Sequence, residues 1–120
     1  MSAIALGRIQ DPQAVPALIE VFKDTNEDVR RGSAQALGCI RDAQAVPTLI
    51  EALRDKNSLV RADAREGLIK FGTMAVPSLI EALLDKNADV HTLALQALND
   101  IGTLEAFAAI KKWHDAFPVT

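Results

Sequence analysis

The chain has 120 residues, 49% hydrophobic and 24% charged, so it is long enough for one hydrophobic core and too apolar for extended disorder. Its net charge of −3 lacks the basic excess that phosphate binding requires, which argues against nucleic acid as a partner. Cys39 is the only cysteine and excludes an internal disulfide, and we find neither an apolar run of about 18 residues nor a signal peptide, so we expect a cytoplasmic protein without a membrane span.

A pattern of 30 or 31 residues recurs along the chain. The tripeptide Ala-Val-Pro begins at Ala14, Ala45 and Ala75. A fixed period of roughly 20 to 50 residues is typical of solenoids, in which each unit buries its apolar face only against neighbouring units. We therefore expect one all-α domain over residues 1–120. Its parts are a half repeat at 1–10, complete repeats at 11–41, 42–72 and 73–102, and a capping half repeat at 103–120.

Each complete repeat begins with an amphipathic helix, which we name helix A. In the repeat at 11–41, Val15, Leu18, Ile19 and Phe22 follow the i, i+3, i+4, i+7 spacing of a helix with one apolar face. Pro16 falls within or just after the first turn, where we expect it either to set the start of the helix or to kink it.

A second helix, helix B, follows a short break in each repeat. Asn26, Asn57 and Asn87 recur at the break and are well placed to cap helix B. Gly38, with Gly72 in the next repeat, is expected to mark the end of a helix or the closure of a repeat. Small residues on one stripe of helix B let neighbouring helices approach closely. They are Ser33 and Ala36, then Ala64 and Gly67, then Ala94 and Ala97.

The segment 103–117 predicts one more helix A, without the VP and LIEAL of the earlier copies. Leu104, Phe107, Ala108 and Ile110 are expected to keep the apolar register. Terminal repeats are atypical because they cap the core, so we expect Trp113 to cover the last apolar surface. With a helix at 2–9 in the opening half repeat, the sequence predicts eight helices.

The run xAVPxLIEAL, then DxN, then VRxxAxxAL, resembles the HEAT repeat, most closely the short form of phycobilisome-lyase-type proteins, over residues 2–102. The resemblance implies a right-handed α-α superhelix, with A helices on the convex side and B helices lining the concave side. It also implies a ladder of turn aspartates facing arginines of helix B. The ladder positions are Asp24 with Arg30, Asp55 with Arg61, and Asp85 with His91. Because His91 replaces an arginine, we expect the ladder to weaken there or to become sensitive to pH.

No catalytic or metal-binding constellation is evident in the sequence. The two histidines, His91 and His114, fall on different predicted helices, and neither belongs to an H-E-x-x-H motif. The serines have no histidine close in sequence, and Ser33 occupies a packing position. We therefore predict that the chain is not an enzyme and uses neither a metal nor a cofactor.

The variable positions of helix B predict where a partner would bind. They are mixed in charge and form neither a basic stripe nor an aromatic platform, which suits a protein or peptide better than nucleic acid. The predicted partner-binding residues are Arg31, Gln35, Ala62, Glu66, Lys70, Thr92, Gln96 and Asp100, with Ile4 and Arg8 in the opening half repeat.

The sequence therefore predicts a non-enzymatic scaffold that binds a partner protein or peptide on the concave helix-B face. One alternative is an accessory or subunit of a bilin lyase-type enzyme, by resemblance to the phycobilisome-lyase repeats. The other is head-to-tail self-association of an otherwise monomeric chain, in which the unpaired terminal helices complete one another. A row of glutamates, Glu20, Glu51 and Glu81, is attributed to solvation of the convex face. Leu59 is apolar where the other repeats have Asp28 and Asp89, so it is either a contact point for a partner or part of the packing between repeats.

Overall fold

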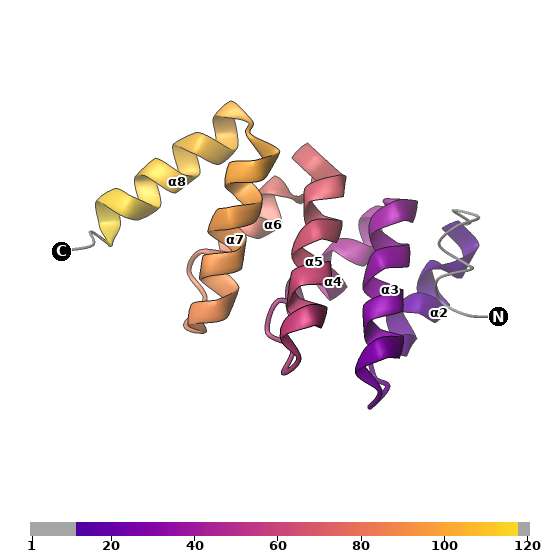
Figure 1. Ribbon diagram of the computed structural model, residues 1–120. Coiled ribbons are helices and arrows are strands. Elements are labelled where there is room, and N and C mark those ends of the chain that lie inside the picture. The colour runs from indigo at the N-terminus through magenta and orange to yellow at the C-terminus, as the bar shows by residue number, and fades with distance from the viewer. Residues whose placement is uncertain (1–11, 118–120) are drawn as a thin grey trace.

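The computed structural model describes residues 12–117, and it is built from helices in the order that the repeats predict (Figure 1). Three A helices, α2 (Val15–Val21), α4 (Val46–Ala52) and α6 (Val76–Ala82), alternate with three longer B helices, α3 (Glu27–Ile40), α5 (Ser58–Phe71) and α7 (Ala88–Ile101), before α8 (Leu104–Ala116). The 3-10 segments η1 (Pro12–Ala14), η2 (Ala43–Ala45) and η3 (Gly72–Ala75) lead into α2, α4 and α6. The described range holds no strand. The helix expected at 2–9 lies outside the described residues, and the other seven are present.

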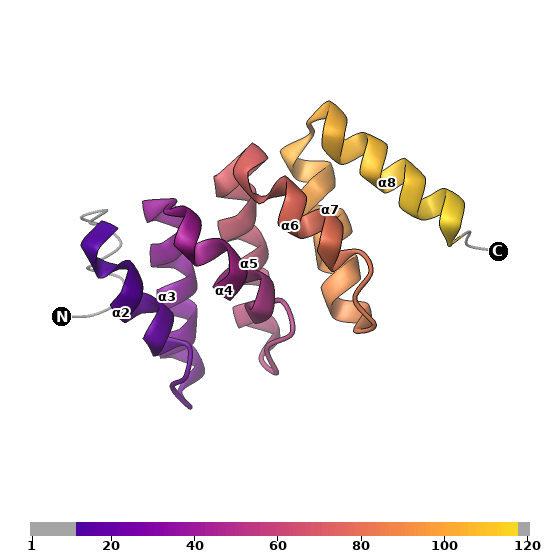
Figure 2. The same cartoon turned by 180° about the vertical axis from the view of Figure 1, so that it is seen from behind.

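The helices form two layers in a stack of about 49 × 27 × 17 Å. Figure 1 shows the B helices α3, α5 and α7 side by side, and Figure 2, from behind, shows the A helices in front of them. Each A helix packs on the B helix that follows it, α3 packs on α5, and α5 packs on α7. The all-α class is thereby confirmed, and the right-handed sense of the superhelix stays a prediction.

The core repeats with the sequence. Leu18, Leu49 and Leu79 occupy one position of the A helices, and all three are fully buried. Leu37, Leu68 and Leu98 do the same on the B helices. Burying a leucine side chain stabilises a protein by about 2 kcal/mol, so these recurring leucines supply much of the stability of each repeat.

Prolines and asparagines set the helix starts. Each A helix begins at the valine before its proline, so Pro16 fixes the start of α2 rather than kinking it. The side chains of Asn26, Asn57 and Asn87 each accept a hydrogen bond from the backbone N–H two residues later, at 2.8 Å. The predicted capping role of these asparagines is confirmed. Such caps contribute about 1 kcal/mol each.

Gly38 corrects one expectation, because it is buried within α3 and does not mark a helix end. A Cβ atom at Gly38 would lie only 2.8 Å from the Cα of Gly67, so two glycines let α3 and α5 come into close contact. The corresponding residues between α5 and α7, one repeat later, are Ile69 and Ala97. Helices α5 and α7 accordingly meet over fewer residues than α3 and α5 do.

The final helix, α8, departs from the register that its sequence predicted. Leu104 is 89% exposed and Phe107 is 46% exposed, whereas Ala106 is fully buried. Ile110 and Trp113 are partly buried against the core. The indole Nε1–H of Trp113 donates to the carbonyl oxygen of Leu83 at 2.8 Å, which fastens α8 to the end of α6. Ile110 and Trp113 therefore face the core, and Leu104 and Phe107 do not.

Candidate functional site

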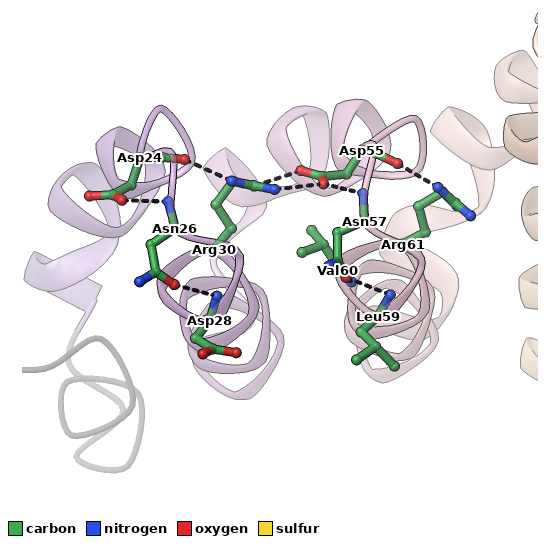
Figure 3. A network of polar contacts seen from close by, with 9 residues as sticks. All are labelled: Asp24, Asn26, Asp28, Arg30, Asp55, Asn57, Leu59, Val60 and Arg61. Carbon is green, nitrogen blue, oxygen red and sulfur yellow. Dashed lines mark hydrogen bonds and ion pairs between the residues drawn. The ribbon is translucent and has the colours of Figure 1, made fainter.

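The turns between A and B helices are shaped by their aspartates (Figure 3). The carboxylate of Asp24 accepts a hydrogen bond from the backbone N–H of Asn26 at 2.8 Å. Asp55 accepts in the same way from Asn57 at 2.9 Å. A short polar side chain that bonds the backbone two residues later closes a tight turn. The aspartate thus closes the turn, and the asparagine that it holds caps the next helix.

Arg30 joins two successive turns, as Figure 3 shows. Its Nη1 donates to the main-chain carbonyl of Asp24 at 2.9 Å, and its Nε and Nη2 donate to the carboxylate of Asp55 at 2.9 and 3.0 Å. The arginine is buried, with 4% of its surface exposed. The expected contact within a repeat therefore reaches the backbone, and the carboxylate contact crosses to the next repeat.

This bidentate pair stays ionised at neutral pH. Burial alone would raise the pKa of the Asp55 carboxyl, but hydrogen bonds from Arg30 and from the Asn57 amide outweigh it and hold the pKa below its ordinary value. The hydrogen bond to Asp55 raises the pKa of Arg30, against the opposing effect of burial. The contact between the first two complete repeats is therefore a fixed ion pair.

The ladder does not continue in the third complete repeat. Arg61 donates to the carbonyl of Asp55 at 2.7 Å, but the carboxylate of Asp85 pairs instead with Arg54, in the turn that follows α4. The pKa of Asp85 is lowered, mainly by the hydrogen bond from the Asn87 backbone amide and to a lesser extent by the hydrogen bond from Arg54. The expected Asp85–His91 contact is present only as a weak electrostatic effect of His91 on the pKa of Asp85, and the His91 ring lies against Trp113 with ring centroids 5.6 Å apart.

Side chains on the B helices link the helices to one another. Arg31 of α3 forms an ion pair with Asp63 of α5 at 2.9 Å, and Gln35 donates to the same carboxylate at 3.4 Å. Arg65 of α5 donates to Gln96 of α7 at 2.7 Å. We name the surface that carries these contacts and the predicted partner-binding residues the helix-B surface.

Comparisons with known proteins fit this geometry. The family model described as HEAT repeats matches residues 1–69, more than half of the chain. The chain belongs to the HEAT repeat family. HEAT repeats generally mediate protein interactions and are typically non-enzymatic. The lyase subtype has no support from this match, which is to HEAT repeats in general.

Among solved structures, this HEAT repeat chain is similar to the crystal structure of an engineered protein. The two are 23% identical with a TM-score of 0.57, and the alignment covers 94% of this chain. It covers 56% of the other chain, so this chain spans little more than half of that protein. At this identity the likeness shows the fold alone. No curated protein matches the chain.

The predicted partner-binding residues of the HEAT repeat chain differ in exposure. Arg31 and Ala62 are half-buried, and Arg31 is already engaged by Asp63. Ile4 and Arg8 lie outside the described residues. The remaining six are exposed, namely Gln35, Glu66, Lys70, Thr92, Gln96 and Asp100.

Sequence reasoning missed Asp63 and Arg65 as part of this surface. Their signal was available, because each lies about one repeat from a polar partner, Asp63 from Arg31 and Arg65 from Gln96. Charged or polar residues one period apart on helix B predict a contact between neighbouring helices.

Two other features are exposed as well. The side chains of Glu20 and Glu51 pair with Lys23 and Arg54 at 3.1 and 3.3 Å on the surface, and Leu59 is 52% exposed.

In residues 12–117 no group of three or more His, Cys, Asp and Glu side chains could hold a metal ion. Within the same range, every helix is too short or too polar to cross a membrane.

Proposed function

We propose that this HEAT repeat chain is a non-enzymatic scaffold that binds a partner protein or peptide on the helix-B surface. The observation that carries the proposal is the continuity of that surface across α3, α5 and α7. Hydrogen bonds from Arg31 to Asp63 and from Arg65 to Gln96 bring the polar faces of the three helices together. Thr92 and Asp100 lie one helical turn to either side of Gln96 and extend the same face.

The packing of the stack supports the choice of the helix-B surface, whose concave curvature stays a prediction. Neighbouring B helices meet over more residues than neighbouring A helices do. The B helices have 14 residues each and the A helices 7, so the B helices present the longer continuous face, and solenoids bind their partners along such extended surfaces. A helix or an extended segment of another protein suits such a surface.

The charges of the helix-B surface favour a partner with charges of both signs. Glu66 and Asp100 are exposed and negative, whereas Lys70 is exposed and positive. Because the cross-helix contacts already hold Arg31 and Gln96, these side chains lose little further conformational freedom when a partner binds. Complementary charges on the partner would supply specificity and speed association more than they would add affinity.

Site-specific photocrosslinking tests the choice of face. A photoreactive side chain at Thr92, exposed on the helix-B surface, should capture a discrete partner from an extract of the source cells. The same group at Gln44, exposed on the side of the A helices, is the matched control and should not capture that partner. Capture of the same partner from Gln44 alone would show that the other face binds.

Affinity for the captured partner gives a second, quantitative measurement. The double variant Thr92→Arg, Asp100→Arg should weaken binding about tenfold or more, because it replaces two exposed contact positions with bulky positive charges. Gln44→Arg, Glu81→Arg changes the net charge by the same amount on the other face and should bind like the wild type. Both variants should keep the wild-type melting temperature, because all four residues are exposed.

A further inference from the structure

An apolar groove lies between α6 and α8, apart from the helix-B surface. It has a volume of about 210 Å³, and its lining includes Ile80 and Leu84 from α6 and the loop after it, with Trp113 and Phe117 from α8 and its end. Leu84 is 72% exposed and Phe117 is 52% exposed. Figure 2 shows α6 in front of α7 with α8 beside it, so the groove belongs to the layer of the A helices.

Leu84 is a departure from the repeat pattern. The equivalent positions in the two preceding repeats are Lys23 and Arg54, which form surface ion pairs with Glu20 and Glu51. A charged surface position has thus become apolar where it borders the groove. Because 72% of its surface remains in contact with solvent, Leu84 adds little to the core of this chain.

The groove offers one unpaired charge and few free polar groups. The indole N–H of Trp113 is already bonded to the carbonyl of Leu83. Lys112 is the one charged residue of the lining, and it forms no ion pair within residues 12–117. The neighbouring Lys111, by contrast, pairs with Asp115 at 3.3 Å. An occupant of the groove would therefore be apolar and would carry a negative charge beside Lys112.

We propose that the groove between α6 and α8 is a second docking surface, which takes an acidic amphipathic helix from a partner protein. Its volume is below the roughly 300 to 1,000 Å³ of sites for small molecules, and it suits one or two apolar side chains. A helix that inserts leucine-like side chains at i and i+3 or i+4 would fill it, and a glutamate on the same helix would pair with Lys112.

The single tryptophan makes the proposal measurable in the intact chain. The probe is a synthetic peptide of about 15 residues, long enough to form some helix, with leucines on one face, glutamates beside them and no tryptophan. It should change the fluorescence of Trp113 in a saturable way. A peptide with lysine in place of each glutamate should bind about tenfold more weakly, and a scrambled peptide of the same composition should not bind.

Variants locate the binding. Leu84→Arg restores the type of residue found in the other repeats, so it should fold normally and lose the fluorescence response. Leu59→Asp is the matched control, since it also replaces an exposed leucine with the residue that other repeats carry, at Asp28 and Asp89, and it should respond like the wild type. Lys112→Glu should reverse the preference, so that the lysine peptide binds more tightly than the glutamate peptide.

Four results would overturn the proposal. They are an unchanged response in Leu84→Arg with native circular dichroism, equal binding of the two charged peptides, no saturation up to a peptide concentration of about 1 mM, and a dimer in light scattering that Leu84→Arg abolishes. The last result would identify a second copy of the chain as the occupant. None of these measurements depends on the helix-B surface, so the earlier proposal stands or falls separately.

Discussion

Replacing Gly38 by alanine tests the close contact between α3 and α5. The new Cβ would lie 2.8 Å from the Cα of Gly67, whereas carbon atoms in favourable contact are about 3.5 to 4.0 Å apart. The obstacle is backbone, so one helix must move by several tenths of an ångström. Gly67→Ala is the matched comparison, because its Cβ would come within 3.3 Å of a flexible leucine side chain, that of Leu49.

The two substitutions should change stability by different amounts. Alanine in a helix is favoured over glycine by about 0.5 to 1 kcal/mol, which applies equally at both positions. Overpacking costs about 1 to 3 kcal/mol when a well-packed contact must shift. Gly38→Ala should therefore lower the free energy of unfolding by about 0.5 to 2 kcal/mol. Gly67→Ala should be near neutral or slightly stabilising, because the Leu49 side chain can move.

Urea unfolding followed by circular dichroism measures both values, with the same dependence on urea concentration expected for all three proteins. Equal stabilisation by the two alanines would refute the reasoning, since it would mean that only helix propensity had changed and that α3 and α5 are not in close contact at Gly38.

Three further predictions concern the core and the ladder. Leu68→Ala should cost about 2 to 5 kcal/mol of unfolding free energy, because Leu68 is fully buried; a loss below about 0.5 kcal/mol in urea unfolding would contradict its place in the core. Arg30→Ala should cost about 2 kcal/mol, and Arg61→Ala about 1 kcal/mol or less, because of these two arginines Arg30 alone also holds a carboxylate of the next repeat among the described contacts; equal costs would contradict a ladder that ends at Arg61. The lowered pKa of Asp55 means that its folded form binds protons less readily than its unfolded form, so the stability that it supplies is full above about pH 4 and is lost as the pH falls through the folded value. Between about pH 5 and about pH 3, the melting temperature of Asp55→Asn should accordingly fall less than that of the wild type.

Features set by local spacing could be predicted from the sequence. The leucines at Leu18, Leu49 and Leu79 recur with the repeat, and a recurring apolar position in a solenoid must face the shared core. The caps at Asn26 and Asn57 follow from the same logic, since an asparagine directly before an amphipathic run has few other uses.

Features that depend on how the helices approach one another could not be predicted from the sequence. The spacing of Asp24 and Arg30 suggested a contact within one repeat. It could not show that the same guanidinium also donates hydrogen bonds to the carboxylate of Asp55 in the next repeat. The place of Gly38 depends on the separation of α3 and α5, which a helix-ending interpretation of glycine ignores.

The final helix shows the same limit. Its apolar residues allow more than one face to turn inward, and the choice is made by Trp113, which is bonded to the carbonyl of Leu83. The repeat pattern of the earlier helices could not supply that contact, because they have no tryptophan.

The contacts between neighbouring B helices differ along the chain, so we expect its two ends to differ in local stability. Helices α3 and α5 are joined both by the approach of Gly38 to Gly67 and by the ion pair from Arg30 to Asp55. Between α5 and α7 the described residues show no such glycine contact. That junction relies instead on the ion pair from Arg54 to Asp85 and the hydrogen bond from Arg65 to Gln96, both of which are more exposed to solvent than the Arg30 pair. In a linear array, stability is the sum of such neighbour contacts, and the weakest one opens most often. Backbone amides of α7 should therefore exchange with deuterium sooner than those of α5, so that the end bearing Trp113 loosens while the Arg30 junction still holds.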